Sequence, residues 1–324
     1  MTRRTFLLSA ALWLGACSAG VPAPIDAILL VGNKGEDTVS FVNLSHGGEE
    51  ARIPTSHGWP HEIAISPDRT EAAVVNYQDH HIDILDMETR TIVRTVDLGE
   101  HTRPHGIEWL DDGRIVASTE GNQSIVEISP DGAVTGIRTN EDGTHMVVVS
   151  PDGRRAYTAN LGAGTVSLID LDTDRLVKTV PAGAGTEGID LTPDGRELWV
   201  SNREADTVTV FDAQSLDRLA SLDVGDFPLR LQISPDGRYA VTSNLRDASL
   251  SVIDVETRAL VRTLEVGRDG PVSMQVTILF SGAGDRIYVA ETGTDTVAEV
   301  DFASGDVLRR FAVGRQGDGL AIVY

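Results

Sequence analysis

A repeated turn is the feature that most constrains what this chain can fold into. The turn reads Ser-Pro-Asp or a close relative of it, and it recurs with aspartates at Asp68, Asp112, Asp152, Asp194, Asp236 and Asp285. The intervals between these aspartates are 44, 40, 42, 42 and 49 residues. Four-stranded propeller blades repeat every ~40–50 residues, so the spacing predicts a β-propeller.

Each repeat carries the period-two pattern of β-strands. After the turn, residues 197–202 and 207–212 alternate apolar and polar side chains, and a third strand follows, as in residues 259–264. A shorter apolar segment such as 188–191 then leads into the next unit. β-Branched residues bounded by Gly, Pro and Asp are typical of strands, and each unit therefore predicts four of them.

The units number seven, and we name their strands a to d from the axis outward. Seven b–c–d sets begin near Ile28, Ala72, Arg114, Arg155, Glu197, Tyr239 and Arg286. Seven a strands begin near His61, His105, His145, Glu187, Leu229, Val272 and Asp318. We predict an all-β, seven-bladed β-propeller of four-stranded antiparallel blades over residues 25–324. The N-terminal strands b, c and d would pair with a C-terminal strand a, which closes the ring and removes its free edges.

The first 24 residues read as an export signal. Arg3 and Arg4 precede an apolar segment, 6–14, that is shorter than the ~20 residues a membrane-spanning helix needs. We expect a lipoprotein-type signal peptide at 1–16, which is removed, and a lipidated tether at 17–24. The segment around Arg3 and Arg4 resembles a twin-arginine export motif.

The single cysteine of the chain, Cys17, ends the sequence Leu-Gly-Ala-Cys. This sequence resembles a bacterial lipobox, in which the cysteine is acylated; the alternative is an ordinary secretory signal with a chance cysteine. The resemblance implies an exported protein anchored by lipid in the cell envelope, on the periplasmic side or at the outer membrane in a Gram-negative cell. Contact with a membrane would then occur only through the lipid on Cys17.

Composition excludes several classes of function. Asp and Glu number 49 against 27 Lys and Arg, which gives a formal charge of −22 and argues against a nucleic-acid partner. One cysteine excludes a disulfide framework, a thiolate zinc site and an iron–sulfur cluster. We expect a monomer whose partner is an unidentified protein or small ligand.

Three segments carry a family resemblance. Residues 156–160 read Ala-Tyr-Thr-Ala-Asn, residues 239–244 read Tyr-Ala-Val-Thr-Ser-Asn, and residues 165–170 read Thr-Val-Ser-Leu-Ile-Asp. These segments resemble the YVTN-repeat, surface-layer-type β-propeller family, whose members have mixed functions. No Trp-Asp dipeptide and no recurring double glycine is present, so the WD40 and kelch alternatives fail.

The histidines are concentrated on one face of the predicted ring. We call the face that carries the b–c loops and the d–a connections the upper face. His61, His105 and His145 each stand seven residues before a turn aspartate, and Glu187 holds the same position in the next unit. These residues should open the a strands at the rim of the central channel. Further residues expected on the upper face are His57, His80, His81, His101 and Asp318, whereas His46 maps to the lower face.

Three interpretations of the channel residues stay open. His61, His105, His145 and Glu187 could hold a divalent transition metal, namely copper, zinc or iron, because imidazole and carboxylate suit these ions. The histidines could instead hydrogen-bond loop carbonyls, or move protons on an organic ligand. The recurring Asn76, Asn160, Asn202 and Asn244 are expected to cap the b–c turns through bonds to the backbone.

Three hypotheses of function follow. The favoured one is a non-catalytic binding or scaffold module with a ligand or metal at the top of the channel. The second is an enzyme that resembles the seven-bladed lactonases and lyases, with His145, Glu187 and Arg230 as catalytic candidates. Arg230 stands one residue past the ring position, so its side chain is expected to turn away. The third is a metal- or haem-handling accessory protein, with no Cys-x-x-Cys-His for covalent haem.

Overall fold

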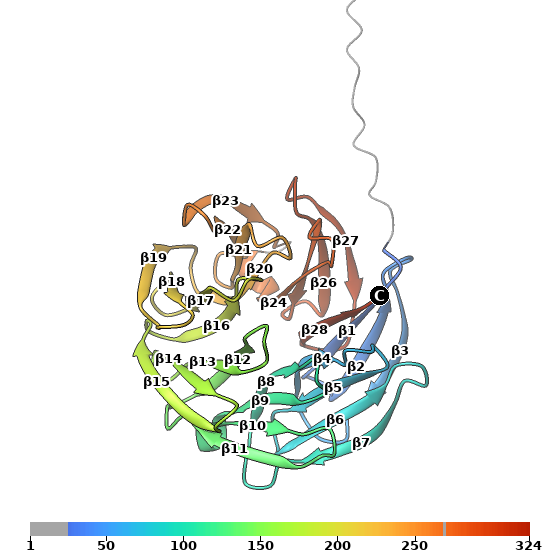
Figure 1. The fold of residues 1–324 in the computed structure, drawn as a ribbon. Coiled ribbons are helices and arrows are strands. Elements are labelled where there is room, and N and C mark those ends of the chain that lie inside the picture. Colours follow the sequence, from blue (N-terminus) through green and yellow to red (C-terminus); the bar gives the residue numbers. More distant parts are fainter. Residues whose placement is uncertain (1–24, 268–269) are drawn as a thin grey trace, which may run out of the picture.

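Seven four-stranded sheets stand around a central axis in the computed structural model of this chain (Figure 1). The structure describes residues 25–267 and 270–324, so the predicted signal peptide with Arg3 and Arg4, and Cys17 with its tether, lie outside the described residues. In each sheet every strand pairs antiparallel with its neighbour. Within the described ranges, no helix is both long and apolar enough to cross a membrane.

The strands and short helices have the following bounds. The strands of the first three sheets, together with one short helix, are β1 (Ile28–Asn33), β2 (Thr38–Asn43), β3 (Gly48–Pro54), β4 (Pro60–Ile65), β5 (Glu71–Asn76), β6 (His81–Asp86), β7 (Thr91–Asp97), β8 (Pro104–Trp109), β9 (Ile115–Thr119), η1 (Glu120–Asn122), β10 (Ser124–Ile128) and β11 (Val134–Arg138). The remaining elements are β12 (Thr144–Val149), β13 (Arg155–Asn160), β14 (Thr165–Asp170), β15 (Arg175–Pro181), β16 (Thr186–Leu191), β17 (Glu197–Asn202), β18 (Thr207–Asp212), β19 (Arg218–Asp223), β20 (Pro228–Ile233), β21 (Tyr239–Asn244), β22 (Ser249–Asp254), β23 (Ala259–Glu265), η2 (Gly270–Ser273), β24 (Gln275–Phe280), β25 (Arg286–Glu291), β26 (Thr296–Asp301), β27 (Val307–Ala312) and β28 (Gly317–Val323).

The ring closes inside one sheet, whose strand order is β28-β1-β2-β3. Strand β28 pairs antiparallel with β1, with Leu29 opposite Ile322 and Leu30 opposite Ala321. The innermost strand of this blade therefore comes from the far end of the chain, as Figure 1 shows where the red and blue segments meet. The predicted seven-bladed fold and its mode of closure are confirmed.

Burial falls into zones along each blade. The second and third strands, such as β5 and β13, are buried at nearly every residue because neighbouring blades cover both of their faces. The outermost strands, such as β7, alternate and expose most of their side chains. One apolar cluster joins Val75 and Ile84 of one blade to Ile107, Ala117 and Val126 of the next. Since each such side chain contributes about 1.5–3 kcal/mol when buried, the contacts between blades hold the ring together.

The Ser-Pro-Asp turn stabilises itself through side chains. The Ser150 hydroxyl donates to Asp152 Oδ1 at 2.6 Å and accepts from the Arg155 amide at 3.0 Å. Gly153 follows at φ +70°, where a side chain would be strained, and its amide donates to the Ser150 carbonyl at 2.8 Å. This local hydrogen-bond pattern therefore explains why the Ser-Pro-Asp sequence recurs at these turns.

The recurring asparagines clasp the b–c hairpins. Asn160 Nδ2 donates to the hydroxyls of Thr165 and Ser167 at 3.0 and 2.9 Å. Asn244 does the same to Ser249 and Ser251, at 3.0 and 2.9 Å. The predicted caps through backbone bonds are wrong: the partners are side-chain hydroxyls of the next strand, and the side chain of Asn76 has no hydrogen-bond partner. The repeat therefore includes two hydroxyl residues, which stand five and seven positions after the asparagine.

A left-handed residue precedes each innermost strand. The residues at this position are Trp59, Arg103, Gly143, Gly185, Phe227, Met274 and Gln316, with φ between +48° and +68°. In each case the carbonyl of this residue accepts an amide from the b–c loop of the same blade, as from Tyr77 to Trp59 at 3.0 Å. This repeat corrects the sixth blade. Strand β24 begins at Gln275, so Val276 and not Val272 occupies the ring position.

Candidate functional site

Three imidazoles meet near the upper end of the channel. His61, His105 and His145 are the second residues of β4, β8 and β12, and each is less than 10 % exposed. The ring centroids of His61 and His105 lie 4.8 Å apart, and those of His105 and His145 lie 3.7 Å apart. The structure therefore brings the three predicted histidines into direct contact.

His145 is held between two carboxylates. Its Nδ1 pairs with Glu120, from η1, and its Nε2 lies 3.3 Å from Glu187 Oε1. Burial alone would lower the pKa of His145, but hydrogen bonds and charge from Glu120 and Glu187 outweigh burial and raise that pKa above its usual 6.5. The two carboxylates therefore favour the protonated form of His145, against the effect of its burial.

Glu187 contacts several of the charged side chains in the channel. Arg230 Nη1 binds its Oε1 at 2.7 Å, and Arg203 Nη1 binds its Oε2 at 2.6 Å. Burial opposes ionisation of this carboxyl, but His145 and the two guanidiniums outweigh burial and lower the pKa of Glu187 to about 2. The three catalytic candidates, His145, Glu187 and Arg230, thus form one connected group.

The expectation that Arg230 turns away from the channel is wrong. Its side chain is buried, and its Nη2 also binds Glu62 Oε1 across the channel at 2.9 Å. The pairing of β20 with β21 shifts register between Pro228 and Arg230. This irregularity breaks strict alternation, so a residue one past the ring position also reaches the channel.

The other two imidazoles have different partners. His61 Nδ1 lies 2.9 Å from the Trp59 carbonyl, so the expected bond to a loop carbonyl is confirmed for this residue. The buried Nδ1 of His105 has no hydrogen-bond partner. Burial, together with His145 and His61, holds the pKa of His105 well below its usual value, so its ring is neutral.

Asp318 completes the ring from the closing strand. Lys34 Nζ binds its Oδ2 at 2.6 Å, and the Thr277 hydroxyl donates to its Oδ1 at 3.2 Å. Burial opposes ionisation of Asp318, but Lys34 and His61 outweigh burial and hold its pKa far below the usual value. His61 Nε2 lies 3.8 Å from the same carboxylate.

A second ring of side chains was missed in the sequence. Its charged and aromatic members immediately follow strand b, and they are Lys34, Tyr77, Glu120 and Arg203. Each contacts the first ring: Tyr77 stacks 4.7 Å from His61, and its hydroxyl donates to Glu120 Oε2 at 2.6 Å. The sequence could have predicted this second ring, because each of its members directly follows the last residue of a strand b. Asn76 and Asn202 mark that position in two of the blades.

Two pockets on the upper face flank this system. One pocket, of about 560 Å³, lies on the upper face. It is lined by Arg103, Glu120 and Arg203, and by residues of the neighbouring loops such as Asp142 and Leu161. A second, of about 520 Å³, is lined by Lys34, Val276 and Thr292.

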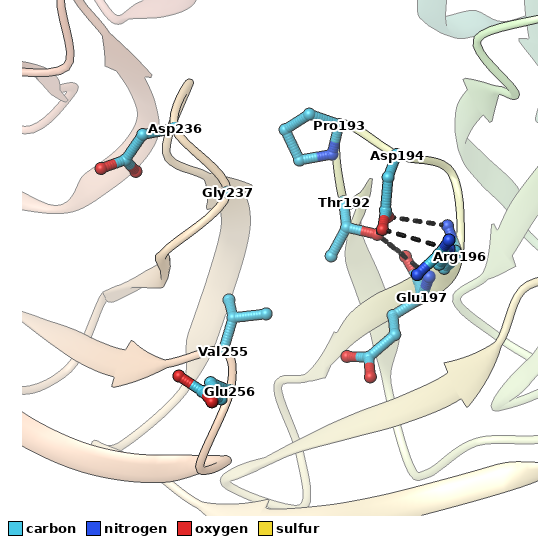
Figure 2. A pocket seen from close by; sticks show the side chains of 9 residues that line it. All are labelled: Thr192, Pro193, Asp194, Arg196, Glu197, Asp236, Gly237, Val255 and Glu256. Carbon is cyan, nitrogen blue, oxygen red and sulfur yellow. Dashed lines mark hydrogen bonds and ion pairs between the residues drawn. The ribbon is translucent and has the colours of Figure 1, made fainter.

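A third pocket, of about 470 Å³, lies on the lower face between two blades (Figure 2). Its Asp194 carboxylate accepts from the Thr192 hydroxyl and the Arg196 amide, so it serves its own turn.

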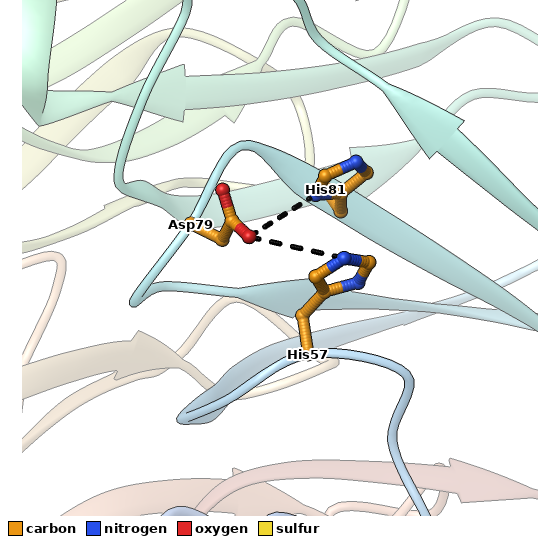
Figure 3. A group of neighbouring side chains, drawn as sticks. All are labelled: His57, Asp79 and His81. Carbon is orange, nitrogen blue, oxygen red and sulfur yellow. Dashed lines mark ion pairs between the residues drawn. The ribbon is translucent and has the colours of Figure 1, made fainter.

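The secondary histidines separate into two groups. His57, His81 and Asp79 point toward one another on the upper face (Figure 3), with His80 beside them. His101 instead lies 3.0 Å from the Ser124 hydroxyl and packs over Gly136.

Metal-ligating atoms converge at the first of these groups. Among the described residues, His, Cys, Asp and Glu ligand atoms come within 4.8 Å of one another in two sets, His57–Asp79–His81 and His80–His81–Asp97. The set predicted from sequence, His61, His105, His145 and Glu187, is not one of these. A metal held by that ring set stays a prediction.

Residues 127–232 match the family model described as "YNCE-like beta-propeller". With the seven blades, this match supports the YVTN-type seven-bladed propeller family. No curated protein matches the sequence.

Solved structures share the architecture at low sequence identity. A functionally unknown protein from Desulfotomaculum acetoxidans superimposes with a TM-score of 0.80 at 16 % identity, covering 92 % of this chain and 99 % of that one. Hydrazine synthase from Kuenenia stuttgartiensis gives 0.76 at 18 %, covering 91 % and 99 %. A putative 6-phosphogluconolactonase from Bacteroides fragilis gives 0.71 at 19 %, covering 94 % and 99 %. At such identities the likeness establishes the fold alone.

Proposed function

We propose that this chain is an exported, lipid-anchored binding module that holds a small polar ligand at the upper mouth of its channel. The observation that carries the proposal is the pocket lined by Arg103 and Arg203. Both guanidiniums also bind channel carboxylates, Arg103 to Glu120 at 2.9 Å and Arg203 to Glu187 at 2.6 Å. A ligand in this pocket would therefore contact donors whose positions are already fixed.

The chemistry of the pocket favours a ligand with a carboxylate or phosphate group. Arg103 is half exposed, and Arg203 keeps a buried Nε without a hydrogen-bond partner. Guanidinium groups recognise planar anionic groups through paired hydrogen bonds. Binding is favoured over catalysis because the channel carboxylates Glu62, Glu120 and Glu187 already have ionic partners.

The test is a thermal-shift screen of small carboxylates and phosphate esters, followed by calorimetric titration of any that stabilise the protein. We expect Arg203→Ala to lose the stabilisation. Arg246→Ala is the matched control, because Arg246 stacks on the same Phe227 ring as Arg203 and makes no channel contact. Equal stabilisation of both variants, or no stabilising compound in the panel, contradicts the proposed ligand site.

The anchoring part of the proposal rests on the lipobox-like sequence that ends at Cys17. Labelled palmitate should be incorporated into the wild-type chain in a bacterial host, and Cys17→Ser should abolish both the label and membrane fractionation. Membrane association that survives this substitution contradicts a lipid anchor.

A second candidate function is acid–base catalysis, and the pairing of His145 with Glu120 and Glu187 favours it. A buried imidazolium oriented by carboxylates is suited to donate a proton to a bound substrate. Lactone hydrolysis that disappears in both His145→Ala and Glu187→Ala would replace the binding proposal with this one.

The third candidate, haem or metal handling, draws on one feature of the channel. His105 presents a neutral ring with an unpartnered Nδ1. One solved structure with this architecture is titled dihydro-heme d1 dehydrogenase NirN in complex with DHE; it superimposes with a TM-score of 0.66 at 17 % identity, covering 91 % of this chain and 74 % of that one. A visible absorption band in the natively purified protein that is lost in His105→Ala would favour this function.

A further inference from the structure

We infer that His57, Asp79 and His81 form a binding site for a divalent transition-metal ion on the upper face, outside the central channel (Figure 3). His57 comes from the connection between β3 and β4, Asp79 from the β5–β6 turn, and His81 from the first residue of β6. Two imidazoles and one carboxylate suit zinc or copper rather than calcium or magnesium. The site is independent of the ligand pocket proposed above.

The spacing of the three ligand atoms fits an ion better than it fits hydrogen bonds. Asp79 Oδ2 lies 3.8 Å from His57 Nε2 and 3.6 Å from His81 Nδ1. Both separations exceed hydrogen-bond length. Ligand atoms about 2.0–2.1 Å from a tetrahedral ion lie about 3.3 Å from each other. The three ligand atoms here all lie within 4.8 Å of one another, so binding an ion requires them to draw closer.

The protein fixes which oxygen of Asp79 faces this space. Asp79 Oδ1 accepts the His80 backbone amide at 2.9 Å and also pairs with the His80 ring. Its Oδ2 is left facing His57 and His81. The turn itself is clamped by the next connection, because Arg103 and Leu98 donate amides to the carbonyls of Asp79 and His80 at 2.8 and 2.9 Å.

The tautomer of His57 is also fixed for metal binding. The Ser56 hydroxyl donates its one proton to the buried Asp83 and lies 2.8 Å from His57 Nδ1. Since that hydroxyl proton is already used, Nδ1–H of His57 must donate to Ser56, which leaves a lone pair on Nε2. A second hydrogen bond of this kind is what orients metal-binding histidines.

The repeat is broken where the site stands. In four other blades an asparagine is followed five and seven residues later by hydroxyl side chains that it binds, as in Asn160 with Thr165 and Ser167. After Asn76 these two positions are His81 and Asp83. Asn76 is fully buried, and neither its Nδ2 nor its Oδ1 has a partner. A buried amide without a hydrogen-bond partner is destabilising, so the blade loses stability at the position where it gains an imidazole.

The His81 ring shows the same lack of a local partner. Its Nδ1 is buried and forms no hydrogen bond, although it lies on the side of Asp79. The rings of His57 and His81 stack with their centroids 3.8 Å apart and an angle of 9° between their planes. Because an imidazole lone pair lies in its ring plane, the two rings must rotate out of this stack before both can bind one ion. The side chains of His57 and Asp79 are 31 % and 37 % exposed, which leaves a fourth coordination position open to solvent.

The test is calorimetric titration of the full chain, stripped with a chelator, with zinc chloride alone. We expect one saturable zinc ion per chain. His81→Thr should abolish it, and the variant should still fold because threonine restores the repeat and gives Asn76 a hydroxyl partner. His46→Thr is the matched control, since His46 lies outside the cluster near Glu50 and should leave binding unchanged.

Three outcomes overturn the site: no saturable zinc binding by the wild-type chain, undiminished binding by His81→Thr, or loss of binding in His105→Ala. The last outcome would move the ion to the channel. Asp79→Asn provides a second ligand variant and should also lose saturable binding. Ser56→Ala should keep one ion per chain but weaken its affinity roughly 10- to 100-fold, which identifies Ser56 as a positioning residue.

Discussion

Glu187 sets the electrostatic character of the channel at the scale of single residues. Its carboxylate receives two guanidiniums and faces the His145 ring. The side chains of Glu187, His145 and Arg230 are buried, so water cannot readily replace a lost partner there, whereas the Arg203 side chain is 26 % exposed. Removing one member of a buried ionic group leaves the others uncompensated, which costs more than the group contributes when intact.

Glu187→Gln should therefore lower the free energy of unfolding by about 3 kcal/mol at pH 7. It should also lower the pKa of His145, because one of the two carboxylates that raise that pKa is gone. Chemical denaturation and the NMR titration of the His145 ring measure the two effects. Glu204→Gln, an exposed change in the adjacent loop, is the control; equal stability of the two variants would contradict this account.

A second carboxyl, Glu108, makes stability depend on pH. Burial, aided by the charge of Asp190, raises the pKa of Glu108 to about 8 from its ordinary 4.5. Between these two values the folded protein retains a proton that the unfolded chain has released. The free energy of unfolding should therefore fall as the pH rises from about 4.5 to about 8.

Glu108→Gln should remove this part of the pH dependence and raise stability at pH 8 by about 1–2 kcal/mol, allowing for water at the partly exposed side chain. Urea denaturation from pH 5 to pH 9 measures it, with the exposed Glu100→Gln as control. A Glu108→Gln curve parallel to that of the wild type would show that Glu108 is ionised in the folded protein.

At the scale of elements, the b–c hairpin shows which features of the structure the sequence predicts and which it does not. The asparagines, the turns and the strand pattern repeat, so their structural role was predictable from recurrence alone. The channel contacts were only half predictable: the positions of His61, His105 and His145 follow from their spacing to the turn. Glu62 and Arg230 join them through irregular register in β4 and β20, which alternation does not report.

The same element explains why the charged network was underestimated. Tyr77 and Glu120 follow strand b of their blades; Tyr77 contacts Glu120, and Glu120 contacts His145, across the boundaries between consecutive blades. The packing of one blade against the next brings them together, and a single repeat does not show that packing. The upper-face histidines were grouped correctly by face. Their convergence at Asp79 depends on which carboxylate oxygen accepts the hydrogen bond from the His80 amide. The spacing of residues in the sequence does not predict this.

The hairpin clasp yields a matched pair of substitutions. Asn160→Ala should lower the free energy of unfolding by about 2 kcal/mol, because the hydroxyls of Thr158, Thr165 and Ser167 each lose one hydrogen bond. Asn76→Ala, at the same position of another blade, removes an amide without partners and should cost much less. Thermal denaturation of the chelator-treated variants compares them; equal losses would mean that Asn76 is paired in solution.

At the scale of the whole molecule, the ring depends on a single strand. Strand β28 supplies the innermost position of the first blade, and it packs beside β4 and β24 of the blades on either side. Without it, β1 would present unpaired backbone groups and buried side chains such as Leu29 to solvent. An open, apolar edge of this kind favours association with other chains.

Deletion of residues 317–324 should therefore replace a single cooperative unfolding transition by a broad one and produce aggregates. Scanning calorimetry and light scattering measure the two effects. Deletion of the half-exposed Tyr324 alone is the control and should leave the transition cooperative. A cooperative monomer without 317–324 would show that six blades and an incomplete seventh suffice.

The position of the closing strand β28 in the sequence also affects the order in which the blades can be completed during synthesis. Ribosomes make β28 after every other strand of the propeller, so the earliest blade waits for its last component until nearly 300 residues have followed it. Domains usually begin to fold as they emerge, but here the first sheet stays incomplete until β28 has been made. A chaperone that binds the nascent chain would therefore have to shield the free edge of β1 until that strand is available.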